Sequence, residues 1–146
     1  MKTSIHRPAG VRQRGAAAVE FALVAIVFLA LIIAVIEFSM LMYVYSSAIE
    51  ATRLGARIAV VCDVDDATVK ARMKNMLSIL EPRNISISYP ASGCSAATCD
   101  PVTVRIQNLT YHASIPLVPL DFPIPDFATS LPRESLSSAD NPLCGP

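Results

Sequence analysis

Residues 12–45 read RQRGAAAVEFALVAIVFLALIIAVIEFSMLMYVY, and this stretch decides what kind of protein the chain is. From Phe21 to Tyr45 only Glu37 and Ser39 interrupt the apolar residues. A helix of that length measures roughly 37 Å, and the hydrocarbon core of a bilayer is about 30 Å thick. Tyr43 and Tyr45 lie at the far end, where aromatic rings favour the membrane interface. The stretch therefore predicts a transmembrane helix over residues 16–45.

The flanking charges predict the orientation of that helix. The first 15 residues carry four basic side chains and no acidic one: Lys2, Arg7, Arg12 and Arg14. A basic flank stays in the cytoplasm, so the C-terminal part is expected outside the inner membrane. Without this flank, 8 basic residues face 12 acidic ones. An acidic remainder argues against nucleic acid as a partner, because phosphate binding needs clustered Lys and Arg.

Two simpler explanations of the apolar run remain open. A cleaved secretory signal has an apolar core of about 7–15 residues and a small-residue cleavage site beyond it. This run is longer, and IEFSMLMYVY, residues 36–45, offers no such site. An uncleaved signal anchor explains the length and the charges. It does not explain why Glu20 and Glu37 lie in or beside the run.

A motif at the start of the run offers a third explanation. Gly15 is followed by AAAV, then Glu20, and Phe21 opens the apolar run. This arrangement resembles the prepilin-peptidase site of type IV pilin-like proteins. The resemblance implies that residues 1–15 form a leader, that the cut separates Gly15 from Ala16, and that the helix stays in the mature protein. Glu20 would then be the fifth residue.

The likeness extends over three blocks. RGAAAVEFALV, IEFSMLMYVY and ATRLGARIAVV together resemble the TadE-like minor pilins, or pseudopilins, of the tight-adherence (Tad/Flp) type IV pilus systems. Ser39 stands where that family often has glycine. FATSLPRES, residues 127–135, resembles the family's closing strand. The resemblance implies a structural pilus subunit whose partners are the membrane, a prepilin peptidase, other pilin or pseudopilin subunits and the assembly platform. It leaves open whether the protein enters an extracellular filament.

Two glutamates and one phenylalanine are the candidate subunit contacts. A charged carboxylate inside a membrane helix costs about 2.5–3.5 kcal/mol on insertion scales and usually has a function or a partner. The resemblance implies that Glu20, beside Phe21, meets the new α-amino group of a neighbouring subunit. Glu37 follows seventeen residues later and faces another side of the helix. The alternatives are a helix-end carboxylate among lipid headgroups for Glu20, and contact with water for Glu37.

The rest of the chain predicts a small exported α+β domain of pilin-like type. Apolar residues spaced by three and four continue the first helix over 46–62 and indicate a second, amphipathic helix over 67–80. Gly55 and the alanines near it allow close packing, with this protein's own domain as the favoured partner. The pattern then alternates around Ile85–Ile87 and over 102–115, which predicts two strands of a small antiparallel sheet within residues 63–146. The proline-rich stretch after Ile115 predicts an extended edge or a surface loop.

Four cysteines, expected in an oxidising compartment, allow three pairings. Cys94 and Cys99 bracket four residues of a loop between the predicted strands, which favours a bond between them. Cys62 and Cys144 would then form the second bond. A zinc site is poorly supported because the spacing lacks two C-x-x-C pairs.

The sequence favours a scaffold over an enzyme. His112 is the only histidine beyond the predicted leader, and no nucleophile motif or cofactor motif accompanies it. DVDD, residues 63–66, lacks the glycine and the glutamate of an EF-hand loop, so Asp65 or Asp66 is interpreted as a helix cap. We therefore expect no catalytic residue, cofactor or metal. The alternative function is an uncleaved, single-pass anchored module whose exported domain binds a ligand.

Overall fold

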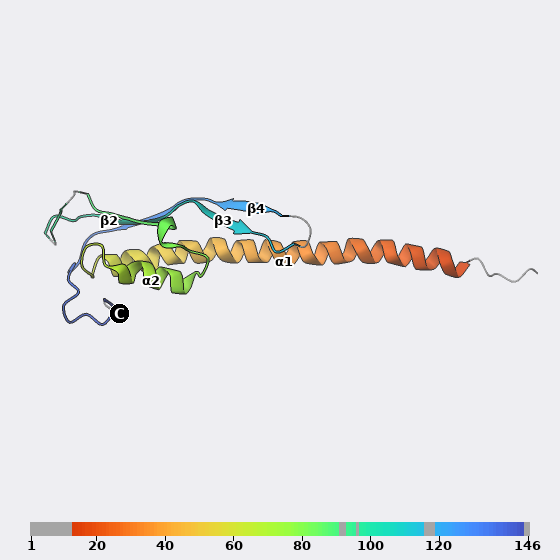
Figure 1. The fold of residues 1–146 in the computed structure, drawn as a ribbon, viewed down its shortest axis with the longest axis horizontal. Helices are drawn as coiled ribbons and strands as arrows, with labels where there is room; N and C mark the ends of the chain where they lie inside the picture. Colours follow the sequence, from red (N-terminus) through yellow and green to blue (C-terminus); the bar gives the residue numbers. More distant parts are fainter. Residues whose placement is uncertain (1–12, 91–92, 96, 116–118, 145–146) are drawn as a thin grey trace, which may run out of the picture. The chain divides into compact units, whose positions relative to one another are not determined.

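The computed structural model describes the chain except for residues 1–12, 91–92, 96, 116–118 and 145–146 (Figure 1). Most of the predicted leader thus lies outside the described residues. The predicted α+β fold is confirmed, with a long apolar N-terminal helix, a short second helix and small antiparallel sheets. The helical elements are α1 (Gln13–Ala59), α2 (Ala67–Met76) and the 3₁₀ turn η1 (Pro82–Asn84). The strands are β1 (Ile85–Ser88), β2 (Val102–Ile106), β3 (Leu109–His112), β4 (Asp121–Ile124) and β5 (Phe127–Leu131).

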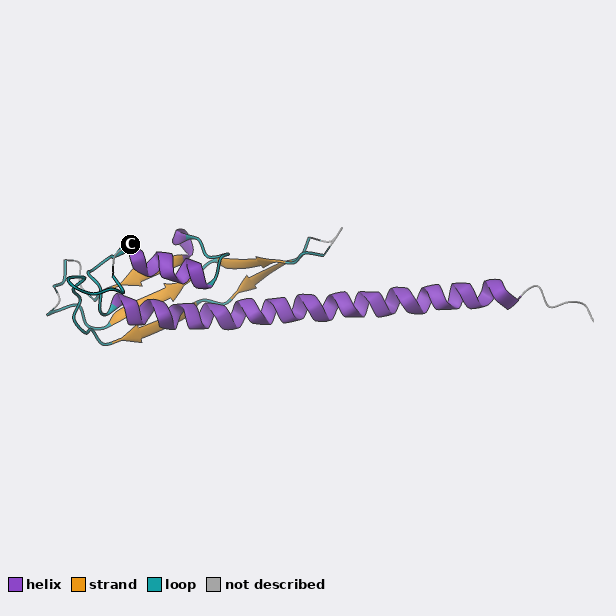
Figure 2. Ribbon diagram, turned by 90° about the horizontal axis from the view of Figure 1, so that it is seen from below, coloured by secondary structure: helices purple, strands orange, loops and turns teal. Residues whose placement is uncertain are grey.

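The chain divides into two compact units, residues 1–38 and residues 39–146. We call residues 15–38 the apolar segment and residues 39–146 the head. Helix α1 contributes to both units, and each unit is described here by itself. In the head, the strands form one layer, and α2 with the C-terminal part of α1 forms the other (Figures 1 and 2). In this arrangement one face of the strand layer meets the helices, as where Val104 of β2 lies beside Gly55 of α1.

The strands of the head form one long bent hairpin with one extra strand. In the three-stranded sheet the order is β1-β2-β5, and β3 pairs with β4 in a second sheet. Ile106 lies opposite Phe127, and Leu109 lies opposite Ile124. The register is therefore continuous from β2–β5 into β3–β4. All pairings are antiparallel, as predicted.

The prediction of one unbroken strand over 102–115 was wrong, because the ladder is interrupted at residues 107–108. Asn108 has a φ of 54°, which no strand residue adopts. On the opposite strand, Pro125 has no N–H to donate. The amide nitrogen of Asn84 donates hydrogen bonds to the carbonyls of Gln107 (3.2 Å) and Asn108 (2.9 Å). A buried side chain thus replaces ladder bonds at the interruption.

The core of the head packs on the small residues of α1. Ala48, Ala51 and Ala56 are fully buried. A methyl group added at Gly55 would lie 2.5 Å from Sδ of Met73 on α2 and 3.2 Å from Cγ1 of Val104 on β2. Glycine at this position therefore lets the second helix and the sheet approach α1 together. The partner of this small-residue face is the protein's own domain, as expected.

Both helices end earlier than predicted. Helix α1 ends at Ala59 rather than residue 62, although the amides of Val60 and Cys62 still bond to Ala56 and Ile58. Helical hydrogen bonds thus continue for a few residues beyond the regular end of α1. Helix α2 ends at Met76 rather than Leu80. Leu77 adopts an extended conformation there (φ −133°), and the turn that follows leaves both Leu77 and Leu80 buried.

The C-terminal segment caps the end of α1. The amides of Glu134 and Leu136 donate to the carbonyl of Val60, at 3.1 and 3.3 Å. The amide of Ser137 (3.0 Å) and the hydroxyl of Ser135 (2.9 Å) donate to the carbonyl of Val61. The last carbonyls of a helix lack partners within the helix. Residues 134–137 supply those partners from the other end of the chain.

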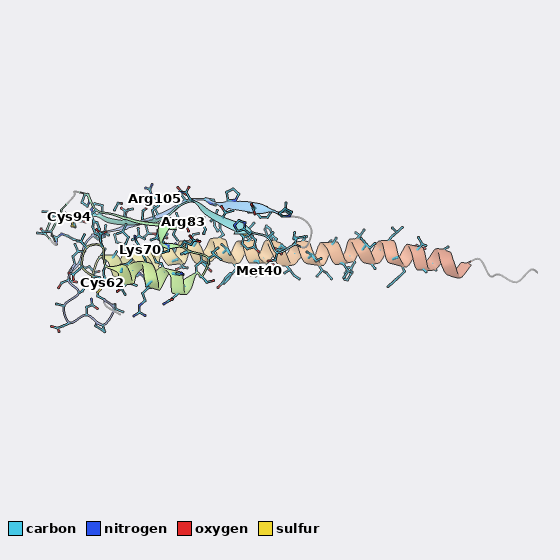
Figure 3. The ribbon with its side chains drawn as sticks, in the orientation of Figure 1. Met40, Cys62, Lys70, Arg83, Cys94 and Arg105 are labelled. Atoms are coloured by element: carbon cyan, nitrogen blue, oxygen red, sulfur yellow. A yellow bond between two sulfur atoms is a disulfide. The ribbon has the colours of Figure 1, made fainter. Side chains whose placement is uncertain are left out.

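Two disulfide bonds close the head. One joins Cys62 to Cys144 and the other joins Cys94 to Cys99, which is the pairing favoured from the spacing. The first bond fixes the C-terminal segment beside the end of α1. The second closes the loop between β1 and β2. Cys62 and Cys94 lie at the same end of the head, away from Met40 (Figure 3).

Candidate functional site

The apolar segment exposes side chains on all of its faces. Among residues 15–38 only Ala25 and Glu37 are half-buried, and every other residue is exposed. Phe21 is 75% exposed and Phe28 is 61% exposed. A helix that is apolar all round needs cover from lipid or from other helices. By length and composition, α1 is the one helix among the described residues that is able to cross a membrane.

Gly15 has no packing role within the described residues. A methyl group added there would meet no atom within 4 Å, although Gly15 and Ala16 both lie in the first turn of α1. Glycine destabilises a helix by about 1 kcal/mol relative to alanine. Contacts made by this chain therefore give no reason for glycine at this position, in contrast to Gly55.

The three candidate subunit contacts lie on α1 in different surroundings. Glu20 and Phe21 are exposed, and Glu37 is half-buried. Seventeen residues separate the two carboxylates, about 26 Å along a helix axis and on different faces. The structure therefore does not bring Glu20 and Glu37 together into one site. Ala16 and Glu20 are four residues apart, so they share a face of the helix.

The head contains a groove of about 920 Å³ beside the β3–β4 hairpin. Met40 of α1 lines one side, and η1 with the turn before it contributes Glu81 and Arg83. His112 and Asp121 line the side formed by the hairpin, and His112 Nδ1 lies 2.6 Å from Asp121 Oδ1. Both side chains are more than half exposed, which makes this a surface pair of the hairpin. Figure 3 labels Met40 and Arg83.

A cluster at the end of α1 has the residue types of a metal site but not the chemistry. Ligand atoms of Cys62, Asp66 and Cys144 lie within 4.8 Å of one another. The two sulfur atoms are bonded to each other, however, and metals bind the thiolate form of cysteine. Asp66 has a different role, since its carboxylate accepts from the amide of Thr68 (2.8 Å) and caps α2 as expected. Ser138 donates to its second oxygen (3.0 Å).

These hydrogen bonds lower the pKa of Asp66. The amide of Thr68 contributes most, followed by the side chain of Thr68, and the hydroxyl of Ser138 adds to the effect while burial opposes it. A carboxyl whose pKa is lowered by folding stabilises the protein above its ordinary pKa of 3.8, and loses that contribution as the pH falls through the folded value. Burial raises the pKa of Tyr89, whose hydroxyl accepts from the amide of Asp65 at 3.1 Å.

The sequence did not reveal the hydrogen bonds that hold the head together over long distances. Nothing was predicted for Asn84, and of residues 134–137 only Glu134 and Ser135 fall in a predicted element, the block that resembles a closing strand. The signals that the sequence offers are an asparagine directly before a predicted strand and a serine-rich tail that contains Cys144. Neither signal identifies the carbonyl that is bound.

Comparison with known proteins finds a family that matches helix α1 but none that matches the sheets. Residues 15–57 match the family described as TadE-like protein. The match begins at Gly15, contains Glu20 and Glu37, and ends at Arg57 in the last turn of α1. It covers less than a third of the chain, and the strands and both disulfides lie outside it. No curated protein and no solved structure matches the chain.

Proposed function

Residues 15–57 of this chain are TadE-like, and from that premise we propose that the protein is a structural minor pilin, or pseudopilin, of a Tad/Flp-type pilus. A prepilin peptidase removes residues 1–15 by cutting between Gly15 and Ala16. Helix α1 then holds the head at the outer face of the inner membrane. The protein assists the assembly or initiation of the pilus and acts as a scaffold rather than as an enzyme.

The exposed apolar segment is the observation that carries this proposal. Its side chains are uncovered on every face, and its N-terminal end carries a glycine for which the chain's own packing gives no reason. An uncleaved anchor explains the first feature but not the second. A helix that stays in the membrane after a peptidase has cut behind Gly15 explains both, since the lipid covers the apolar segment and the peptidase requires the glycine. The basic residues before Gly15 keep this end in the cytoplasm.

Cleavage changes the electrostatics of the helix start. In the uncut chain Glu20 is the eighth residue of α1, beyond the first turn. After the cut it becomes the fifth residue, close to the positive end of the helix dipole and to the new amine of Ala16. An isolated subunit can place its own amine against Glu20, four residues along the same face. In an assembly the carboxylate of one subunit exchanges this partner for the amine of a neighbour.

Such a pair fixes the register of neighbouring subunits rather than adding to the affinity between them. The attraction of two charges in a low dielectric is large, but the cost of removing both from water offsets much of it. The affinity between subunits then comes from the packing of the exposed apolar side chains, including Phe21. We propose Glu20 and Phe21 as one contact and Glu37, on another face, as a second.

The experiment is the N-terminal sequence of the protein recovered from membranes, with and without a co-expressed prepilin peptidase. We expect Ala16 as the first residue with the peptidase and the full leader without it. Gly15→Leu should block the cut, because the bulky side chain does not fit before the scissile bond. Gly10→Leu is the matched control, a glycine of the leader at which the same change should leave the cut at Ala16.

Two outcomes would decide against the proposal. If Gly15→Leu were trimmed as efficiently as the unchanged protein, the assigned cleavage site would be wrong. If the leader remained on the protein in cells that contain the peptidase, the uncleaved anchored module would be the better description.

A further inference from the structure

The end of the β3–β4 hairpin is apolar where hairpins in water are polar. The ladder continues past β3 to a bond from the amide of Ala113 to the carbonyl of Leu120 (2.9 Å). Residues 113–120 read ASIPLVPL and contain no charged side chain. Short hairpin connections in water favour Asn, Asp and Gly. Leu120 is 40% exposed and Phe122 is 38% exposed, so the head itself does not cover them.

The hairpin runs along α1 toward the start of the head. The hydroxyl of Thr129 lies 3.1 Å from that of Thr52, and the rings of Phe127 and Tyr45 meet edge to face at 5.0 Å. Further along the same ribbon, Asp121 lines a groove with Met40. As the hairpin continues from β5 to β4, it therefore lies beside residues of α1 with successively lower numbers. Figure 2 shows the hairpin extending beyond the three-stranded sheet.

This direction leads to the point where α1 would leave a bilayer. The span predicted over residues 16–45 is longer than a bilayer needs, since about 20 residues from Phe21 end near Met40 and Val44 beyond it is buried by the head. Exposed Tyr43 follows Met40, a residue type that favours the headgroup level. Met40 shares its groove with His112 and Asp121, the last polar pair before the apolar end of the hairpin. Leu120, one residue beyond Asp121, and Phe122, one residue before it, therefore lie near the level of Met40, at the depth of the lipid headgroups.

We propose that Leu120 and Phe122 of the β3–β4 hairpin form a second membrane contact, in which both side chains enter the outer headgroup region. The inference rests on the anchoring of α1 in the proposed function. Pro119 and Pro123 suit this role, since neither residue has an N–H that would lose its water. Two contacts fix the orientation of the head on the membrane, whereas α1 alone would leave it free to turn about the helix axis.

Tryptophan fluorescence tests the depth of the hairpin, because the chain has no tryptophan of its own. Phe122→Trp is placed in the full-length protein and reconstituted in vesicles of phosphatidylethanolamine and phosphatidylglycerol with brominated acyl chains. Leu143→Trp is the control in the head, at an apolar position that is 54% exposed. Phe28→Trp reports whether the apolar segment itself lies in the bilayer.

We expect brominated lipid to quench Phe122→Trp and Phe28→Trp, and to leave Leu143→Trp unchanged. Iodide in the water should quench Leu143→Trp most. If Phe28→Trp is quenched while Phe122→Trp behaves like Leu143→Trp, the anchor stands and this inference falls. Shielding of Phe122→Trp only when partner subunits are present would also overturn it, in favour of a protein contact. Absence of lipid quenching at Phe28 and Phe122 alike would remove the anchor and this inference with it.

Discussion

Glu20 and Glu37 are the two charged side chains of the apolar segment, and their surroundings differ. Glu20 is exposed, whereas Glu37 is half-buried. A carboxylate in lipid keeps its charge only when a cation or water compensates it. The cation proposed for Glu20 exists only after the leader has been removed. The role of Glu20 is therefore expected to depend on cleavage and on neighbouring subunits, rather than on the fold of the head.

Replacing Glu20 by glutamine should separate assembly from anchoring. Glu20→Gln keeps the size of the side chain but removes the charge that pairs with an α-amino group. We expect normal cleavage and normal recovery in membranes, with clear loss of co-purifying pilin subunits. Glu50→Gln is the matched control, since Glu50 is an exposed carboxylate of the same helix that pairs with Arg53 at 2.7 Å. Equal co-purification of both variants would refute the role given to Glu20.

Gly55→Ala should destabilise the head even though alanine favours a helix. The added methyl group would meet Met73 and Val104 at less than a normal contact distance. Overpacking of this kind costs about 1–3 kcal/mol, against a gain of about 1 kcal/mol in helix propensity. Denaturation of the full chain in detergent measures the difference. Gly15→Ala is the control and should leave head stability unchanged, since nothing surrounds that position. A more stable Gly55→Ala variant would show that Met73 moves aside freely.

At the scale of elements, the bent hairpin depends on a side chain from outside the sheet. Asn84 is only 8% exposed and satisfies three main-chain groups. It donates to the carbonyls of Gln107 and Asn108, and its oxygen accepts from the amide of Glu81 at 3.1 Å. Asn84 thus holds the two halves of the hairpin at residues 107–108, where the pairing of the strands is interrupted. The position of β3–β4 beside Met40 follows from this connection.

Asn84→Ala should therefore loosen the hairpin. The substitution leaves two part-buried carbonyls and one amide without this partner, at a cost of about 1–3 kcal/mol. We expect a lower unfolding midpoint and faster amide hydrogen exchange in β3 and β4 than in β2. Gln107→Ala removes a neighbouring side chain but keeps the main-chain carbonyl that Asn84 binds, so it should have little effect. Unchanged exchange in β3 and β4 of the Asn84 variant would mean that packing alone sets the bend.

At the scale of the whole molecule, the two disulfides close loops of very different length. The bond between Cys62 and Cys144 spans 82 residues of sequence, and the bond between Cys94 and Cys99 spans 5. The chain-entropy model assigns about 4–5 kcal/mol to the long loop and about 2 kcal/mol to the short one. The long loop also contains every strand of the head, and its bond holds the segment that caps α1.

Removing the long-range bond should thus destabilise the head more than removing the local one. Cys62→Ser with Cys144→Ser should lower the free energy of unfolding by roughly 2 kcal/mol more than Cys94→Ser with Cys99→Ser. Equilibrium denaturation of both double variants in the same detergent gives the comparison. Equal stability of the two variants would indicate that the hydrogen bonds of residues 134–137 hold the C-terminal segment without the disulfide.

Patterns within one element were predictable from the sequence. The apolar run required a helix, and the spacing of Val69 and Met73 indicated the face of α2 that is buried. The alternation of Val102, Val104 and Ile106 indicated a strand that is buried on one side, and the structure has it so. These patterns depend on local geometry, which the order of residues records directly.

Contacts between distant elements were not predictable in the same way. The strand predicted through residue 115 breaks at Asn108, because the proline opposite it and the side chain of Asn84 become neighbours only in the folded head. The capping of α1 by residues 134–137 likewise depends on where the C-terminus arrives. For the candidate site, Gly15 and Glu20 were visible as a motif, whereas the groove at Met40 required the hairpin to be placed.

The intact mass of the wild-type protein extracted from membranes tests the central claim most directly. The proposal predicts a single species that has lost residues 1–15 and nothing else, so that Ala16 is its first residue and the apolar segment is retained. A species that keeps Met1, or a head found in the soluble fraction without residues 15–38, would contradict it.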